Sequence, residues 1–176
     1  MMGGKAWFLL LALSGAALDL FTKDLVFRRL RHHAETNPHP SREVVPAFFR
    51  LTCVENRGGM WGIGADHGKL LAGLRAVAVL AIAGFVLRLR GHRFLHAALG
   101  LIFAGALGNL WDSFFNEGKV RDFLDLYVGS AHWPAFNVAD ALICAGSGLL
   151  LLQMVTERRE TPASAVKGRK LEEAGS

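Results

Sequence analysis

Two copies of one polar pattern, Asn-x-x-Asp, interrupt an otherwise apolar chain. The first copy pairs Asn109 with Asp112, and the second pairs Asn137 with Asp140. Each pair borders an apolar stretch, so its carboxylate is expected at the edge of a membrane span rather than in the middle. Two carboxylates that face each other across a water cannot both ionise cheaply. Such a pair can activate that water for attack on a carbonyl group.

Further ionisable residues are expected at the same membrane face. Asp19 and Lys23 are four residues apart, so they share a helix face and can form an ion pair. Asp122 and Asp125 lie in the connection between the two Asn-x-x-Asp patterns. Taken singly, each group has an ordinary explanation as a helix cap, a paired or snorkelling side chain, or a solvated acid. Because ionisable groups near hydrocarbon are costly, the whole set favours a functional cluster.

Composition indicates the elements that must hold these groups. Of 176 residues, 52% are hydrophobic and 20 are Gly, which is too apolar for an ordinary soluble domain. About 20 consecutive apolar residues cross a bilayer. The sequence therefore predicts a mainly α membrane fold, a single domain over residues 1–155 followed by a polar cytoplasmic tail at 156–176. Its four predicted transmembrane helices are residues 6–26, 70–89, 94–115 and 136–155.

The connections are expected to add a small β-rich platform on the non-cytoplasmic face. The segment "FFRLTCVENRGGMWGIG" has the β-branched and aromatic alternation of a strand, interrupted at Gly58 and Gly59. The preceding "HHAETNPHPSREVVPAFF" is interpreted as turn-rich. The connection at residues 116–134 includes the amphipathic "KVRDFLDLYVG", which is expected to pack beside the platform.

Basic residues predict the orientation in the membrane. Arg88, Arg90 and Arg93 lie between the second and third predicted spans without an acid, which is typical of a cytoplasmic turn. Lys5 and the basic tail indicate that both termini are cytoplasmic as well. The N-terminal stretch has the features of a cleavable signal peptide, but its apolar character continues to Val26, which favours a retained span. The net charge of +5 points to anionic lipid rather than nucleic acid.

Other chemistries are less well supported by the sequence. Cys53 and Cys144 are far apart and form neither a CxxC motif nor a disulfide framework. Ser14 lies nine residues from Lys23, on about the opposite side of a helix, which disfavours a Ser/Lys protease. A divalent-metal site remains an alternative, although its His lacks ligand spacing. Its ligands would be Asp122, Asp125, His132 and Asp140.

Five sequence blocks resemble one family. They are "DLFTK" from Asp19, "NRGGMWG" from Asn56, "GALGNLWD" ending at Asp112, "VRDF" around Asp122 and "FNVAD" ending at Asp140. In this order they resemble lipoprotein signal peptidase, the type II signal peptidase of bacterial inner membranes. The resemblance implies a four-helix membrane bundle with an extracytoplasmic β-rich platform and a helical loop over the active site. It also implies hydrolysis of the peptide bond just before a diacylglyceryl-modified Cys in a prolipoprotein.

The same resemblance implies that Asp122 and Asp140 are the catalytic residues. One carboxylate would act as general base on water, while its protonated partner would stabilise the oxyanion, so neither a metal nor another cofactor is expected. The other residues of the blocks would bind substrate or support the site. They are Asp19, Lys23, Asn56, Gly58, Gly108, Asn109, Asp112 and Asn137.

Partners and location follow from the same resemblance. The expected partners are a prolipoprotein with a diacylglyceryl-Cys and the membrane lipids, with no nucleic acid, and the protein is expected to be a monomer. Burial of the acyl chains would contribute about 0.8 kcal/mol per CH₂ to binding. The expected location is the bacterial inner membrane, as a multi-pass protein with its active site on the periplasmic side.

One departure from the family pattern concerns a cation. The block that ends at Asp112 usually continues with Arg, which would help to hold substrate carbonyls, but here Ser113 follows. Arg121 is the candidate replacement for that fixed donor. On this basis Ser113→Arg is predicted to leave activity equal or higher. Two alternatives stay open: a paralogue that binds lipoproteins with weak or no cleavage, and a small transporter, which should spread its carboxylates across the bilayer.

Overall fold

The computed structural model describes residues 3–32, 40–57 and 68–173, with side chains described as far as Thr156. Gly58 and Gly59 lie outside these residues. Within these residues the chain forms four helices and four strands. They are α1 (Gly4–His32), β1 (Ser41–Val45), β2 (Phe49–Asn56), α2 (Gly68–Arg88), α3 (Arg93–Phe115), β3 (Val120–Val128), β4 (Ala131–His132) and α4 (Val138–Glu173).

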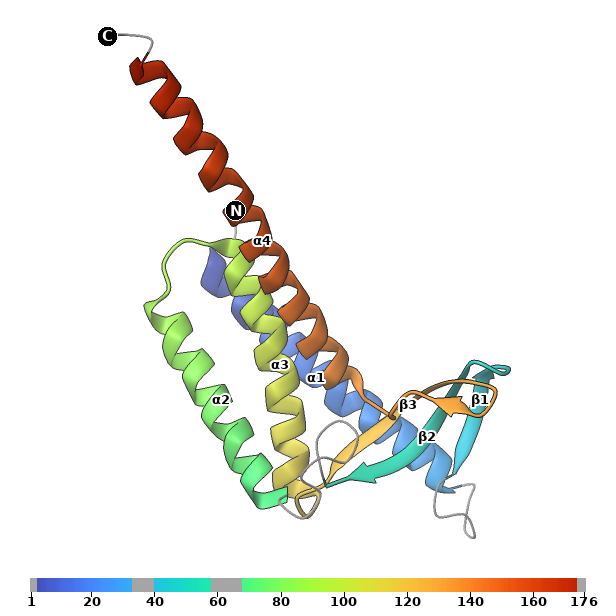
Figure 1. The fold of residues 1–176 in the computed structure, drawn as a ribbon. Helices are drawn as coiled ribbons and strands as arrows, with labels where there is room; N and C mark the ends of the chain where they lie inside the picture. The colour runs from blue at the N-terminus through green and yellow to red at the C-terminus, as the bar shows by residue number, and fades with distance from the viewer. Residues whose placement is uncertain (1–2, 33–39, 58–67, 174–176) are drawn as a thin grey trace.

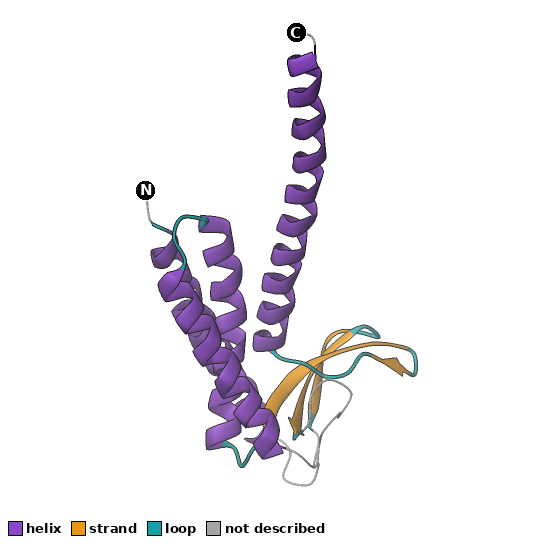
Figure 2. Cartoon of the chain, turned by 60° about the vertical axis from the view of Figure 1, so that its left-hand side comes forward, coloured by secondary structure: helices purple, strands orange, loops and turns teal. Residues whose placement is uncertain are grey.

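Helix α3 is the centre of the bundle. It packs against α1 and α4 and, on another side, against α2. The turn between α2 and α3 lies near the N-terminus, whereas the sheet lies at the opposite end of the bundle (Figure 1). A turned view shows the strands gathered at the foot of the helices (Figure 2). The bundle therefore has the α2–α3 turn at one end and the sheet at the other.

Small residues bring the helix backbones together. A Cβ added at Gly105 of α3 would overlap the carbonyl of Ala139 in α4. A Cβ added at Gly146 of α4 would lie 2.6 Å from the carbonyl oxygen of Ala98 in α3. Such close approach is typical of helix packing in membranes, where van der Waals contact replaces the hydrophobic effect. The α3–α4 contact therefore depends on positions without a side chain.

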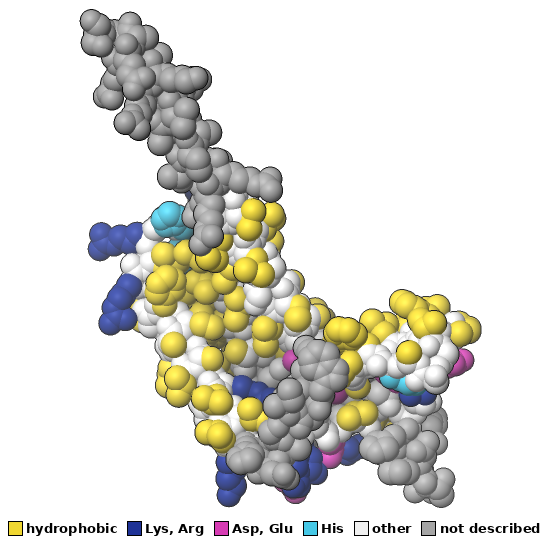
Figure 3. Space-filling model, in the orientation of Figure 1, with side chains coloured by type: hydrophobic (Ala, Val, Ile, Leu, Met, Phe, Trp, Pro, Cys, Tyr) yellow, Lys and Arg dark blue, Asp and Glu magenta, His cyan; other side chains and the backbone are white. Residues whose placement is uncertain are grey.

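Three of the described helices are long and apolar enough to cross a membrane. They are α2, α3 and the part of α4 from Val138 to Thr156. Apolar side chains cover much of the bundle in this view, with Lys and Arg side chains at its two ends and one further basic patch between them (Figure 3). The predicted span at residues 6–26 corresponds to α1, which this criterion does not select and which carries Asp19 and Lys23. The protein is thus mainly helical and membrane-integral, with a small antiparallel sheet.

The boundaries of two helices differ from the predicted spans. Helix α1 continues beyond residue 26 to His32, because its last turns pack against the sheet. There Val26 and Phe27 form one buried cluster with Cys53 of β2 and Phe123 of β3. Helix α4 continues through the predicted tail as far as Glu173. Within the described residues no further helix is present, so none covers the site as the family resemblance implied.

The sheet is antiparallel, with the strand order β1-β2-β3-β4. Strand β2 was predicted from its alternation, whereas β1 lies in the segment interpreted as turn-rich and β3 in the segment described only as amphipathic. In the β2–β3 register, Val54 pairs with Asp122 and Asn56 with Val120. Because of this register, the end of β2 and the start of β3 lie together at the foot of α3 and α4.

Candidate active site

The first turn of α4 orients Asp140. The backbone N–H of Asp140 donates to Oδ1 of Asn137 at 3.0 Å, and the backbone N–H of Asn137 donates to Oδ2 of Asp140 at 3.2 Å. This reciprocal pair has the geometry of a capping box. The cap inferred from the sequence is therefore present, but it does not exhaust the role of Asp140. Its Oδ1 accepts a further hydrogen bond from Nδ2 of Asn109 on α3, at 2.9 Å.

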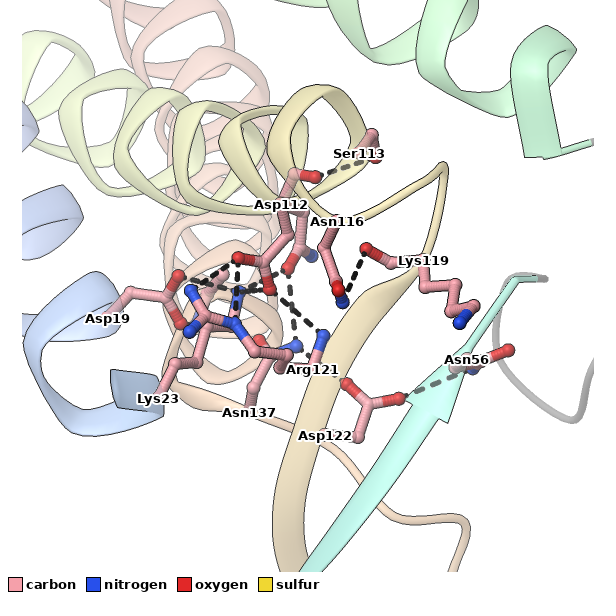
Figure 4. A network of polar contacts seen from close by, with 12 residues as sticks. Asp19, Lys23, Asn56, Asp112, Ser113, Asn116, Lys119, Arg121, Asp122 and Asn137 are labelled. Atoms are coloured by element: carbon pink, nitrogen blue, oxygen red, sulfur yellow. Dashed lines mark hydrogen bonds and ion pairs between the residues drawn. The ribbon is translucent and has the colours of Figure 1, made fainter. Parts of the chain in front are cut away.

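Strand β3 brings a second buried carboxylate to the same place. Asp122 is 3% exposed. Its Oδ1 accepts from Nδ2 of Asn137 at 2.7 Å, and its Oδ2 accepts from Nδ2 of Asn56 at 3.3 Å (Figure 4). Asn137 thus caps the helix that carries Asp140 and also donates to Asp122. One residue, Asn137, therefore bonds two carboxylates from different elements, Asp122 through its side-chain amide and Asp140 through its backbone N–H.

The surroundings of Asp122 favour its protonated form. Burial raises the pKa of the Asp122 carboxyl to about 7, and the nearby charge of Asp140 contributes in the same direction. The hydrogen bonds from Asn137 and Asn56 favour the ionised form and limit this rise in pKa. Near neutral pH the site can therefore hold one proton between two carboxylates. That is the state required for combined acid and base chemistry.

Lys23 of α1 is fully buried beside the carboxylates. Its Nζ lies 2.7 Å from Oδ2 of Asp19 and 3.3 Å from Oδ2 of Asp112, and it donates to Oδ1 of Asn109 at 2.9 Å. The ammonium group is therefore ion-paired with two buried carboxylates and donates one hydrogen bond to the Asn109 amide oxygen. The polar group of Asn109 is therefore fixed between Lys23 on one side and Asp140 on the other.

Asp19 attaches α1 to the start of α4. Its Oδ1 accepts from the backbone N–H of Ala139, the second residue of that helix, at 2.8 Å. The first N–H groups of a helix have no partner within the helix, so this carboxylate satisfies one of them. A Cβ at Gly108 would overlap the Asp19 carboxylate, so only Gly fits there without a shift. Asp19 and Gly108 together hold the turn that carries Asp140.

Asp112 fixes the start of β3 by binding both the backbone and the guanidinium group of Arg121. Its Oδ1 accepts from Nε and Nη2 of Arg121 at 3.1 and 2.7 Å, and its Oδ2 accepts from the Arg121 backbone N–H at 2.9 Å. These bonds place Asp122, the next residue, at the site. Because its guanidinium is bound to Asp112, the expectation that Arg121 replaces the missing Arg at position 113 is wrong.

A cavity of ≈ 70 Å³ lies between the two carboxylate-bearing elements and is roomy enough for water. The segment from Trp133 to Phe136 and several polar side chains line it. The lining residues are Asn56, Arg75, Asn109, Val120, Asp122, Trp133, Pro134, Ala135, Phe136 and Asp140. Water bound here can be activated by one carboxylate while the other donates to a carbonyl oxygen.

Asp125 does not join this cluster. It lies three residues along β3 from Asp122, so its side chain points to the opposite face of the strand. Its carboxylate is 2.6 Å from Nε of Arg50 and 3.1 Å from Nδ1 of His132. Among the described residues, no three His, Cys, Asp or Glu side chains come together in a metal-binding arrangement. Gly58, which the family resemblance assigned to substrate binding, lies outside the described residues.

Arg75 was not among the site residues predicted from the sequence. It lies on α2, lines the cavity and donates from Nη1 to Oγ of Ser113 at 2.9 Å. The available signal was a single Arg within the apolar run from Leu70 to Leu87, since a charged residue in a span is a functional candidate by default. Its partner could not be read from the sequence, because Ser113 lies 38 residues away on another helix.

Proteins of known family resemble this chain along most of its length. The family model for signal peptidase (SPase) II matches residues 11–156. The lipoprotein signal peptidase of Geobacter sulfurreducens is 39% identical over 155 residues, which cover 85% of this chain and 92% of that protein. The lipoprotein signal peptidase of Syntrophotalea carbinolica is 42% identical over 148 residues, which cover 82% and 88% of the two chains.

Solved structures share the fold. A bacterial membrane enzyme solved at 2.3 Å superposes with a TM-score of 0.74 and 27% identity, over 86% of this chain and 88% of that one. A second, solved at 1.9 Å, gives a TM-score of 0.69 and 28% identity, over 84% and 91% of the two chains. The family model and these relatives cover most of the chain, and the chain therefore belongs to the signal peptidase II family of aspartic-type proteases.

Proposed function

We propose that this enzyme removes the signal peptide from diacylglyceryl-modified prolipoproteins, with Asp122 and Asp140 as its catalytic pair. The observation that carries the proposal is the position of Asn137, which caps the helix of Asp140 and donates to Asp122 beside a cavity. The substrate class is supported by the names of the relatives, which are lipoprotein signal peptidases. No comparison favours a binding paralogue or a transporter.

The reaction requires only the two carboxylates and water. Asp140 takes a proton from water while the water oxygen attacks the scissile carbonyl carbon. Asp122, whose pKa is raised, donates its proton to the carbonyl oxygen. Asp140 then passes its proton to the leaving nitrogen as the C–N bond breaks. The new carboxyl group re-forms its carbonyl by returning a proton to Asp122. Both residues end in their starting states.

The neighbouring side chains orient this pair. Asn109 and Asn137 each donate an amide N–H to one of the carboxylates, and Lys23 holds Asn109 from the opposite side. Asn56, at the end of β2, lies against Asp122 and lines the cavity, where it can contact the bound peptide. Misplacement of any of these groups is expected to lower the rate, because general acid–base catalysis depends on hydrogen-bond geometry.

The proposal includes α1 as a fourth span. The charges of Asp19 and Lys23 are buried against α3 and α4 rather than turned to lipid, which removes the main objection to placing α1 in a bilayer. The basic turn with Arg88, Arg90 and Arg93 then lies on the cytoplasmic side, together with both termini. The active site lies at the other end, on the periplasmic side of the inner membrane. The proposed unit is a monomeric single domain of residues 1–155 with a cytoplasmic tail.

The test is cleavage of a diacylglyceryl-modified prolipoprotein by the purified enzyme in detergent, read as a gel shift. The variants are Asp122→Asn and Asp140→Asn, with Asp125→Asn as a matched control on the same strand. We expect each dyad variant to lose at least about 100-fold in rate, the low end of what a positioned acid or base contributes. Asp125→Asn and added chelator should leave cleavage intact, and the unlipidated precursor should be a poor substrate.

Three results would contradict the proposed function or its mechanism. Cleavage at wild-type rate by either dyad variant would remove that residue from the mechanism. A wild-type protein that binds the lipidated precursor without cleaving it would instead support the paralogue interpretation. Sensitivity to chelator would point to a metal-dependent hydrolase.

A further inference from the structure

Arg75 is the one Lys or Arg among the described residues that line the catalytic cavity. Its Nη1 donates to Oγ of Ser113, and the same hydroxyl donates to the backbone carbonyl of Asn109 at 2.8 Å. The Ser113 hydroxyl is therefore both acceptor and donor, which fixes its direction. It holds the guanidinium next to Asn109, the residue that bonds Asp140.

Arg75 has unused hydrogen-bonding capacity. A guanidinium carries five N–H donors, but within the described residues Arg75 donates one hydrogen bond, to Ser113, and forms no ion pair within 4 Å. Two other cations lie near the site: Lys23 contacts Asp19, Asp112 and Asn109, and Arg121 is paired with Asp112, but neither is among the residues that line the cavity. Arg75 is therefore the cation with donors available for a ligand in the cavity.

Arg75 also lies where two pockets meet. A second pocket, almost entirely apolar, runs between α2, α3 and α4 and shares Arg75 and Asn109 with the catalytic cavity. Its other lining residues are Leu71, Leu74, Ala78, Ile82, Ile102, Ala106 and Ile143. A ligand that extends from hydrocarbon to the carboxylates must pass the guanidinium. In a lipidated peptide, carbonyl oxygens occur where the acyl chains join the peptide, so they would be the groups next to Arg75.

We propose that Arg75 is a substrate-binding residue whose guanidinium, held by Ser113, donates to a carbonyl oxygen of the lipidated substrate where the apolar pocket opens on the catalytic cavity. This inference rests on the proposed function. The acceptor is an ester carbonyl of the diacylglyceryl group or a peptide carbonyl next to the scissile bond. The guanidinium comes from α2, which accounts for Ser at position 113, where the family block usually has Arg.

Ser113→Arg is expected to lower activity, contrary to the prediction from the sequence. Because Arg75 is already bonded to Ser113, the new side chain would place two guanidinium groups in the same space. In an Arg75→Gln background, however, the new Arg would have room and could supply the missing donor from α3. The double variant should therefore regain activity that Arg75→Gln loses, which is a strongly non-additive result.

The experiment measures kcat and KM for ester-linked and ether-linked diacylglyceryl prolipoproteins. It compares wild type, Arg75→Gln, Arg75→Lys and the Arg75→Gln/Ser113→Arg double variant, with Arg88→Gln as the control Arg on the same helix. We expect Arg75→Gln to lower kcat/KM by about 10- to 100-fold, mainly through KM, as loss of a charged hydrogen bond implies. Arg75→Lys should lose less, Arg88→Gln nothing, and the double variant should recover most of the loss.

The ether-linked substrate identifies the acceptor. If the loss caused by Arg75→Gln disappears with the ether, the acceptor is an ester carbonyl, and if it persists, the acceptor is a peptide carbonyl. Thermal unfolding of each variant separates these effects from misfolding. Wild-type kcat/KM in Arg75→Gln, or a loss that neither Arg75→Lys nor the double variant relieves, overturns the inference alone. A wild-type enzyme that cleaves neither substrate overturns the proposed function as well.

Discussion

At the scale of single residues, the site combines four carboxylates, Asp19, Asp112, Asp122 and Asp140, with one buried ammonium group, Lys23. Asp19 and Asp112 form ion pairs with Lys23, which also donates a hydrogen bond to Asn109. Removing one partner from a buried ionic network is more damaging than removing an exposed one, because the remaining charges lose their compensation without regaining water. The same helix offers an exposed comparison in Arg28, which pairs with Asp24.

We predict that Lys23→Met destabilises the protein by about 3–5 kcal/mol, the range for breaking a buried pair. Arg28→Met removes an i,i+4 ion pair of the same spacing, but its side chain is 80% exposed, so the expected effect is within about 1 kcal/mol. The measurement is unfolding in detergent followed by circular dichroism. Similar stability losses in the two variants would mean that burial of Lys23 is energetically unimportant.

The raised pKa of Asp122 leads us to predict that the cleavage rate depends on pH. Its proton is needed at the carbonyl oxygen, and the pKa of Asp122 is raised to about 7 by burial and by the charge of Asp140. The reactive form is therefore lost as pH rises through about 7, and we expect kcat/KM to fall on the alkaline side of that value. Steady-state rates from pH 5 to 9 test this, with Asp125→Asn as a variant that should keep the same profile. A rate that still rises at pH 9 would contradict the assignment of Asp122 as the acid.

The same pKa affects stability with a defined sign. The folded-state pKa of Asp122 lies above its ordinary value of 3.8, so the folded protein binds more protons than the unfolded chain between these two values. The contribution of protonated Asp122 to the free energy of unfolding is therefore fully present below about pH 4, and it is lost as pH rises through about 7. Asp122→Asn removes this titration, so its melting temperature relative to wild type should be higher at pH 8 than at pH 5.

At the scale of elements, the position of α4 against α3 determines whether Asp140 reaches Asn109. Gly146 lies in this contact, where a Cβ would meet the Ala98 carbonyl oxygen at 2.6 Å and Ile102 Cγ1 at 2.7 Å. Gly148, two residues further along α4, has no such neighbour within 4 Å. The two glycines therefore have different roles in the same helix.

We predict that Gly146→Ala destabilises the protein by about 1–3 kcal/mol, as overpacking does, and also lowers activity because α4 must shift. Gly148→Ala should be neutral or stabilising by up to about 1 kcal/mol, since Ala is the better helix former. Melting temperatures and cleavage rates of the two variants provide the comparison. A destabilised Gly148→Ala or a wild-type-like Gly146→Ala would be inconsistent with this packing.

At the scale of the whole molecule, the chain has a basic end and a catalytic end. Arg88, Arg90 and Arg93 lie at the turn between α2 and α3, whereas the carboxylates lie near the sheet at the opposite end (Figure 1). In the proposed orientation the basic turn is cytoplasmic, as the positive-inside rule favours, and the catalytic end is periplasmic.

We predict that a membrane-impermeant maleimide labels Glu117→Cys in intact spheroplasts but labels Arg90→Cys only after lysis. Both substitutions are made in a background with Cys53 and Cys144 replaced by Ala, which removes the native thiols. Glu117 lies in the turn after α3, at the catalytic end, and Arg90 lies in the turn between α2 and α3. The reverse labelling pattern would invert the proposed orientation and move the active site to the cytoplasm.

Local patterns in the sequence determined a large part of this protein. Apolar runs long enough to cross a bilayer predicted α2, α3 and the membrane part of α4, because hydrophobicity and length are properties of one continuous segment. Asn137 and Asp140 were recognisable as a helix start for the same reason, since a capping box involves residues three apart. The blocks around these residues also indicated the family.

Tertiary structure alone decided which polar groups meet. Strand β3 was not recognised, because its pairing with β2 depends on residues far away in the chain, and that register is what brings Asp122 to Asn56 and Asn137. The cation was likewise misassigned: Arg121 is adjacent to Asp122 in sequence but bonds Asp112, whereas Arg75 reaches the cavity from another helix. Adjacent residues on a strand point to opposite faces, while packed helices bring distant residues together. Sequence proximity therefore cannot identify the partners of a buried charge.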